Sequence, residues 1–292
     1  MPANSTVACV LLIGAVLAPG LAAAQAGNGP PSPAMQHAVH LDLEGATARA
    51  RTVFQGLVDS AADPAARAAA ERAMAMSYAF DGDCANTVKY EQMVIAYWFT
   101  REAAEPQNAF YQEGEMADEA ARVCVDAGDL DAAEHWYRRG YALGVAEPAP
   151  PTHPRSLWEY RLAHALGRLA ARRGDSAEAR RQIAAARLIL DGDSAMATGQ
   201  RRFFPYLVGY VALYAGDLST AEAQLRVAVG LRGNERDPYL RCLLGEALER
   251  LGRKDEATAA YREAYDLATA HNPPAAFVRP FVRRKLGLPA AP

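Results

Sequence analysis

Cysteine is scarce in this 292-residue chain, and the motifs that identify metal and catalytic sites are missing. No two of the four cysteines stand at metal-ligand spacing, which argues against a zinc site. The chain also lacks a glycine-rich phosphate loop, a Gly-x-Ser-x-Gly turn and a His-Glu-x-x-His motif. Because an enzyme needs a positioned acid, base or nucleophile, we expect no catalytic residue, no metal and no cofactor.

A marked excess of charge of either sign is absent as well. The 31 Lys and Arg residues and the 34 Asp and Glu residues leave a formal net charge of −3. No motif combines basic and aromatic residues in the manner of a nucleic-acid-binding protein. We therefore expect no general affinity for nucleic acid or for an anionic membrane surface.

Valine, isoleucine and phenylalanine are sparse, whereas alanine is abundant and 51% of all residues are hydrophobic. A chain of this length and composition can bury a substantial core. Alanine favours closely packed helices, and the low content of valine, isoleucine and phenylalanine disfavours sheet.

The start of the chain carries a long apolar run. Residues 7–17 are apolar, a Pro-Gly pair ends the run, and small residues follow at 22–26. This order predicts an export signal over residues 1–26, and hence a periplasmic or secreted bacterial protein. No Lys or Arg precedes the run, so a retained membrane anchor over residues 6–24 is the alternative.

After residue 26 the sequence has no further run that is long and apolar enough to cross a membrane. The mature chain is therefore expected to contain no transmembrane segment. Residues 27–40 include the stretch Pro30-Pro31-Ser32-Pro33 and predict a flexible, extended leader.

A glycine-centred turn recurs between alanine-rich helical patterns. Its glycines are spaced 46, 46, 42 and 36 residues apart, and aspartate follows each of them except the last: Gly82, Gly128, Gly174, Gly216 and Gly252. Glycine supplies the left-handed conformation that ends one helix, and aspartate caps the next. Alanine or glycine stands seven positions before each of them, which predicts a close contact between two helices that a larger side chain would overpack.

The last of these turns lies in a stretch that resembles the tetratricopeptide repeat, a 34-residue helix–turn–helix unit. Residues 238–271 carry the resemblance at Leu244, Gly245, Leu248, Gly252, Ala257, Tyr261 and Ala264. By the same register, further units are expected at 68–101, 114–147, 160–193 and 202–235. The first of these is degenerate, with Thr87 and Glu91 at positions where the family has alanine and an aromatic residue, and the second also has features similar to the Sel1-like repeat.

The resemblance implies an all-α fold, an α-solenoid of about five such repeats over residues 64–274. Residues 41–63 are expected to form an N-terminal helix that covers one end of the array. Residues 275–292 are expected to form a short capping helix and tail at the other end. Inserts between the units fall near residues 102–113, 148–154 and 191–200, where loops or helix extensions are expected.

Three cysteines and several histidines follow the predicted signal. A disulfide between Cys84 and Cys124 is conceivable in an exported protein because the two lie on adjacent units, but we favour buried, unpaired thiols. His135 and His164 are expected on helix surfaces.

In tetratricopeptide arrays the first helix of each unit lines a concave face that binds ligands. Carried over by register, the resemblance implies a partner-binding groove of basic and aromatic residues: Arg161, His164, Arg168, Arg172, Phe203, Tyr206, Tyr210, Tyr214 and Tyr239. Arginines bind carboxylates and tyrosines supply rigid contact area. The alternative is that Tyr210 and Tyr214 pack between units and that the arginines are solvated.

Together these patterns predict a non-catalytic scaffold or adaptor of the bacterial cell envelope that binds a protein or peptide in its groove. One alternative is an accessory subunit or enzyme of envelope or polysaccharide processing, with a site on the inserts at 148–154 or 191–200. Another is a structural repeat protein that associates with itself.

Overall fold

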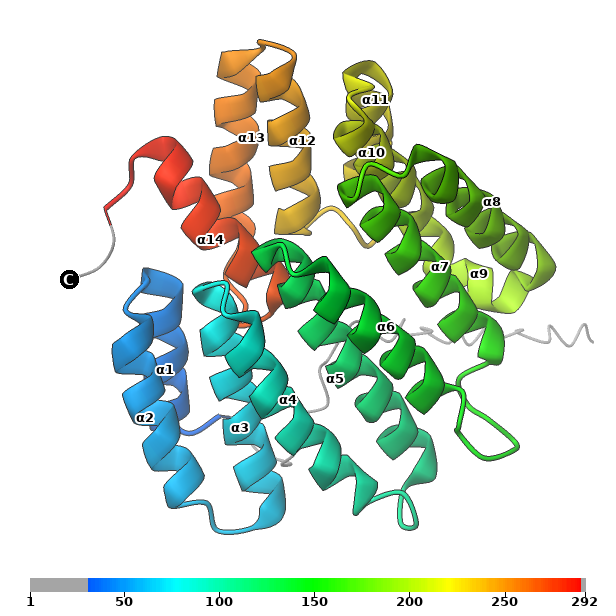
Figure 1. Ribbon diagram of the computed structural model, residues 1–292. Helices are drawn as coiled ribbons and strands as arrows, with labels where there is room; N and C mark the ends of the chain where they lie inside the picture. Colours follow the sequence, from blue (N-terminus) through cyan, green and yellow to red (C-terminus); the bar gives the residue numbers. More distant parts are fainter. Residues whose placement is uncertain (1–30, 290–292) are drawn as a thin grey trace, which may run out of the picture.

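The computed structural model describes residues 31–289, and this part of the chain is helical and contains no strand. Six antiparallel helix pairs stack side by side in sequence order, which confirms the expected all-α solenoid (Figure 1). The pairs are α1 (Pro33–Glu44) with α2 (Thr47–Asp59), α3 (Pro64–Phe80) with α4 (Cys84–Phe99), α5 (Pro106–Ala127) with α6 (Leu130–Gly144), α7 (Arg155–Arg172) with α8 (Ser176–Gly192), α10 (Phe204–Ala215) with α11 (Leu218–Gly230), and α12 (Pro238–Arg250) with α13 (Lys254–Leu267). The short helices α9 (Ser194–Gln200) and η1 (Arg201–Phe203) precede α10, and α14 (Pro273–Leu286) ends the described chain.

The first helix of each pair, here called the inner helix, usually begins with proline. Proline occupies the first turn of α1, α3, α5, α10 and α12, where its missing N–H is not needed. The second helices α4, α6, α8 and α11 begin after an aspartate whose carboxylate accepts a hydrogen bond from the backbone two or three residues into the helix. An aspartate also caps the inner helices α3 and α12, so the proline in the first turn is the signal that distinguishes these inner helices from the second helices.

The turn within each pair is the predicted glycine turn. The five glycines at positions 82, 128, 174, 216 and 252 have φ between +69° and +88°, a region that other residues rarely adopt. The close contact predicted at Gly245 is also present, because a Cβ atom placed there would lie 2.6 Å from the Tyr261 ring. The register of the last unit is therefore confirmed at both its turn and its helix–helix contact.

The N-terminal boundaries differ from those expected. Residues 33–40, assigned to a flexible leader, form most of α1, because Ser32 caps the helix and Pro33 fits its first turn. The single helix expected over residues 41–63 is interrupted at Gly45, which has φ +89° and separates α1 from α2. The array thus begins with a complete helix pair. The predicted signal at residues 1–26 lies outside the described residues.

The C-terminal helix α14 begins at Pro273, two residues before the expected boundary, and it joins the two ends of the array. It lies between the first and last helix pairs (Figure 1) and packs against α3, α12 and α13. His271, just before α14, is 2.8 Å from the buried Asp42 carboxylate of α1, and Arg279 and Arg283 donate to the backbone oxygen of Leu43. The helix was expected to cover one exposed end, and it instead closes the solenoid on itself.

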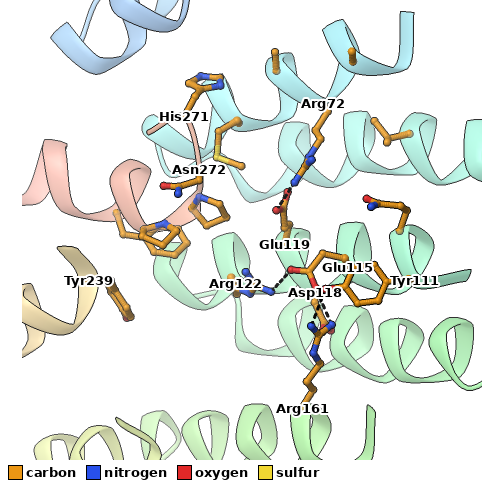
Figure 2. A pocket seen from close by; sticks show the side chains of 18 of the residues that line it. Arg72, Tyr111, Glu115, Asp118, Glu119, Arg122, Arg161, Tyr239, His271 and Asn272 are labelled. Atoms are coloured by element: carbon orange, nitrogen blue, oxygen red, sulfur yellow. Dashed lines mark hydrogen bonds and ion pairs between the residues drawn. The ribbon is translucent and has the colours of Figure 1, made fainter. Parts of the chain in front are cut away.

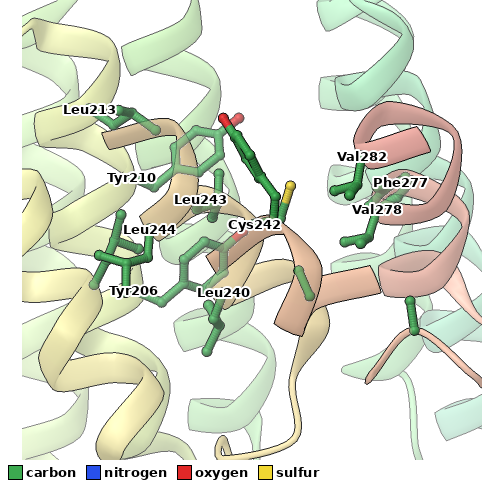
Figure 3. Packing of buried hydrophobic residues seen from close by; sticks show 14 of the residues in the cluster. Tyr206, Tyr210, Leu213, Leu240, Cys242, Leu243, Leu244, Phe277, Val278 and Val282 are labelled. Atoms are coloured by element: carbon green, nitrogen blue, oxygen red, sulfur yellow. The ribbon is translucent and has the colours of Figure 1, made fainter. Parts of the chain in front are cut away.

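Large side chains fill the space between α10, α12 and α14. Tyr206 and Tyr210 of α10 pack among leucines of α12, while Val278 and Val282 of α14 close the cluster from the other side (Figure 3). Tyr210 and Val282 are completely buried. This apolar cluster fixes the last two pairs and α14 relative to one another.

Cys84, at the start of α4, and Cys124, in the last turn of α5, form a disulfide, with their Cα atoms 4.7 Å apart. The expectation of two unpaired thiols is therefore wrong, because adjacent units bring the two residues together. Cys242 is a buried free thiol. Within residues 31–289, no helix combines the length and the apolar character that crossing a membrane requires.

Candidate functional site

A cavity of about 2010 Å³ lies on the inner side of the closed array. Its walls come mainly from the inner helices α3, α5 and α7, and α4, the α9–η1 segment and the starts of α10 and α12 add to them. The N-terminal turns of α1 and α14 complete its border. Aromatic and charged side chains from several pairs face the same space. This cavity is the candidate binding site.

One side of the cavity, here called the charged wall, consists of Arg72, Glu115, Glu119, Arg122 and Arg161 (Figure 2). Glu115 binds two arginines, Arg122 and Arg161, each through a contact of 2.8 Å. Arg72 and Glu119 pair at 2.7 Å. Each arginine of the wall is thus held by a carboxylate from α5.

The two arginines decide the charge of Glu115. Burial alone would raise the pKa of this carboxyl group, but Arg161 and Arg122 outweigh burial and hold the pKa at about 2. Glu115 therefore stays ionised under all ordinary conditions. Arg161 also donates to the Tyr111 hydroxyl at 3.1 Å, which ties the start of α5 to α7.

Two further carboxyl groups near the wall have no such partner. Asp118 lines the cavity at 5% exposure, and burial raises its pKa to about 7 although Arg161 favours the ionised form. Glu91 of α4 is fully buried, neither of its oxygens has a hydrogen-bond partner within residues 31–289, and burial raises its pKa well above the usual range. At neutral pH Glu91 is therefore uncharged and Asp118 is only partly ionised.

Another side of the cavity, here called the tyrosine pocket, consists of Arg168, Tyr137, Tyr206 and Tyr239. Arg168 donates to the Tyr206 hydroxyl at 3.0 Å and to the Tyr137 hydroxyl at 3.1 Å. Its guanidinium also lies over both rings, with centroid distances of 5.5 and 5.6 Å. Tyr239 of α12 meets Tyr206 edge to face.

Of the nine predicted groove residues, some line the cavity and the others pack against neighbouring side chains outside it. Six of them line the cavity, namely Arg161, His164, Arg168, Phe203, Tyr206 and Tyr239. Tyr210 is fully buried, and Arg172 hydrogen-bonds its hydroxyl at 3.4 Å while lying over the Tyr214 ring. Those three residues are outside the cavity lining, so a role for them in partner binding stays a prediction.

The two histidines fall in different environments. His135 is exposed, as expected. His164 is buried, with Nε2 at 3.2 Å from the Phe203 backbone oxygen, so its expected place on a helix surface is wrong. Burial, assisted by the nearby Arg168 charge, lowers the pKa of His164 well below its usual value, and this imidazole is therefore neutral at pH 7. No group of three or more His, Cys, Asp or Glu side chains within residues 31–289 is arranged to hold a metal ion.

Several lining residues were not found from the sequence. Tyr137 lies on the second helix of its pair, which the register assigns to the outer layer, yet its hydroxyl reaches Arg168. Tyr111 falls in a segment treated as an insert, and Arg72 falls in the degenerate first unit. A helical extrapolation of α5 backward from Glu115 would have placed Tyr111 one turn away on the same face.

Residues 238–271 match the family model of the tetratricopeptide repeat. This match covers α12 and α13 together with the turn between them. No curated protein matches the chain.

Proposed function

We propose that this chain, which carries a tetratricopeptide repeat within a closed α-solenoid, is a non-catalytic scaffold that binds a segment of a partner protein in its central cavity. Repeats of this family generally mediate interactions between proteins. The observation that supports the proposal most directly is the cavity itself. Its volume of about 2010 Å³ and its lining by residues of several helix pairs suit a peptide segment.

The charged wall supports a binding role in preference to a catalytic one. Glu115 is held ionised between two arginines and cannot serve as a proton donor near neutral pH. Such a fixed array of charges provides orientation and selectivity for a ligand that passes over it.

The inserts offer less support for an enzyme. Glu147, in the segment between α6 and α7, accepts hydrogen bonds from the backbone of Thr152 and His153 and contacts the His153 ring at 3.1 Å. Asp193 caps α9 and accepts a hydrogen bond from Ser156 at 2.6 Å. Both carboxylates are thus engaged in holding their own segments, and the accessory-enzyme alternative has no specific observation in its favour.

We place the scaffold in the bacterial cell envelope, in the periplasm or outside the cell. Two features support this location: the signal-like residues 1–26 and the Cys84–Cys124 disulfide. Disulfides form and persist in oxidising compartments and are rare in the cytosol. An intact mass of the protein recovered from its host tests the processing step, because a chain that still includes residues 1–24 would contradict signal cleavage.

Site-specific photo-crosslinking tests binding in the cavity. A photoreactive phenylalanine analogue replaces Phe203, a half-buried cavity residue, or Leu188 on the outer surface of α8, which is 72% exposed. The proposal expects one defined partner segment, mapped by mass spectrometry, to be crosslinked at position 203 and not at position 188. Equal capture at both positions, or capture at 188 alone, would contradict it.

A further inference from the structure

We propose that Arg168, together with the hydroxyl groups of Tyr137 and Tyr206, forms an anion-binding pocket inside the cavity, and that this pocket binds a carboxylate of the partner segment. The inference rests on the proposed function, since it names the chemistry of the ligand at one part of the same cavity. The pocket joins three helix pairs, because its residues come from α6, α7 and α10.

The first observation is that Arg168 is a buried cation without an anion. Its side chain belongs to a residue only 9% exposed, and its hydrogen bonds go to two tyrosine hydroxyls and to the backbone oxygen of His164. Within residues 31–289, Arg168 forms no ion pair with a carboxylate. A buried charge without a counter-charge is costly, so this position favours an anionic ligand.

The second observation is that the two hydroxyls have unused hydrogens. Tyr137 and Tyr206 each accept a hydrogen bond from Arg168, and neither donates one to any other group within residues 31–289. Each phenol has one O–H donor and tends to find an acceptor when buried. Both residues line the cavity, so an acceptor supplied from the cavity would complete both groups at once.

The third observation is the charge of the surroundings. Glu115 is already shared by Arg122 and Arg161. Asp118, whose carboxyl group is close enough to be influenced by the Arg168 charge, is only partly ionised at neutral pH because burial raises its pKa to about 7. Asp237, near Tyr206, caps α12 by accepting hydrogen bonds from the backbone of Tyr239 and Leu240. None of these carboxylates forms an ion pair with Arg168.

A single guanidinium flanked by two O–H donors matches a carboxylate, which carries one charge and two acceptor oxygens. The ligand group is either an Asp or Glu side chain within the partner segment or the carboxylate at its end. These two sources share the same chemistry, and the pocket does not depend on which of them supplies it.

The experiment uses a random dodecapeptide library displayed on phage, selected on the purified protein in parallel with an Arg168→Gln variant. A Tyr137→Phe/Tyr206→Phe variant keeps the rings and the arginine and removes only the two hydroxyls. Arg173→Gln serves as the matched control. Arg173 directly follows α7, the helix that carries Arg168, and it pairs with Asp131 and Glu134 outside the cavity. Circular dichroism confirms that each variant is folded.

We expect the unmodified protein to select peptides enriched in Asp or Glu. Their affinity, measured by fluorescence polarisation, should fall about tenfold or more in both the Arg168 and the double tyrosine variants, and should stay unchanged in the Arg173 control.

Synthetic versions of one selected peptide identify the source of the carboxylate. One version has an amidated C-terminus in place of a free one, and in others each acidic residue is changed to its amide. One result would overturn the anion pocket and leave the proposed function intact. In that result the selected peptides compete with crosslinking at position 203, but they are not enriched in Asp or Glu and bind the double tyrosine variant with unchanged affinity. A complete failure to select cavity-binding peptides would contradict both.

Discussion

The charged wall and the tyrosine pocket both contain buried arginines, but the arginines of the two regions have different hydrogen-bond partners. In the wall, Arg122 and Arg161 share the Glu115 carboxylate, and Arg72 is paired with Glu119. In the pocket, Arg168 has hydroxyl groups in place of a carboxylate. Every arginine of the wall is paired with a carboxylate, whereas Arg168 forms no ion pair within residues 31–289.

This difference separates a structural role from a binding role. A buried ion pair holds helices in place, and removing one of its partners is strongly destabilising. A buried charged side chain without such a partner stabilises the fold little and is available to a ligand. The two regions should therefore respond differently to mutation, to pH and to reduction. The following expectations run from the largest effect to the smallest.

The largest effect on stability should come from the disulfide between α4 and α5. Cys84 and Cys124 are 40 residues apart in sequence and join α4 to α5, the helix that carries Glu115 and Glu119. Closing a loop of that length is worth about 4 kcal/mol in the chain-entropy description. A Cys84→Ala/Cys124→Ala variant should lose stability of that order in urea denaturation. Dithiothreitol should lower the stability of the parent and leave the variant unchanged, and equal sensitivity of both proteins to the reductant would contradict this assignment.

A slightly smaller effect is expected at Glu115. Replacing it with Gln leaves Arg122 and Arg161 without their common carboxylate, and breaking a buried ion pair on one side costs about 3 kcal/mol. Chemical denaturation of Glu115→Gln measures this loss. Glu159→Gln is the matched control, since Glu159 pairs with Arg155 on the exposed side of α7 and its side chain is 41% exposed; its change should stay within about 0.5 kcal/mol. Similar losses for the two variants would mean that the wall is no more structural than a surface pair.

The sign of the pH dependence follows from Asp118, which lies near both regions. Its pKa is raised from 3.8 to about 7 by burial, so the folded protein holds this proton more tightly than the unfolded chain does. The stabilisation is complete below the unfolded value and is lost as the pH rises through 7. From pH 5 to pH 8 we expect Asp118 to contribute a loss of about 2 to 3 kcal/mol. Thermal and urea denaturation at the two pH values should therefore show a smaller loss in Asp118→Asn than in the parent. The same change in stability from pH 5 to pH 8 in the parent and in Asp118→Asn would contradict the raised pKa.

The repeating part of the fold could be predicted from the sequence because its signals are local. A glycine that needs positive φ, such as Gly128, and an aspartate that caps the next helix mark each turn within a few residues. The position of Gly245 against Tyr261 follows from the same register. These features repeat, so an error at one unit would be visible at the next.

The ring closure could not be predicted in this way, since it depends on the accumulated rotation of six helix pairs. The contact between Asp42 and His271 joins residues 229 positions apart, and nothing in either local sequence indicates it. The start of α1 is hard to predict for a different reason: a run of prolines is typical of an extended leader, but Pro33 also fits the first turn of a helix.

The candidate site was predicted only in part, because a register assigns a residue to a face but does not choose its partner. Arg161 and Arg168 are both on the inner face of α7, yet only Arg161 reaches a carboxylate. That distinction depends on which side chain the neighbouring pairs present: Glu115 from α5 in one place, and Tyr137 and Tyr206 in the other. Binding of a partner by the predicted groove residues stays a prediction.

The smallest effect should come from Arg168, and it tests the comparison most directly. Replacing this side chain with Met removes a buried charge that has no carboxylate partner and fills similar space with apolar atoms, an exchange that is often neutral or favourable. Tyr137 and Tyr206 lose a donor but keep their own O–H groups, which cavity water can satisfy because both residues line the cavity. We therefore expect Arg168→Met to change the free energy of unfolding by less than about 1 kcal/mol, in contrast to the loss at Glu115. Urea denaturation of the two variants under the same conditions measures the contrast, and a loss at Arg168 as large as that at Glu115 would show that the arginine holds the helix pairs together and is not kept for a ligand.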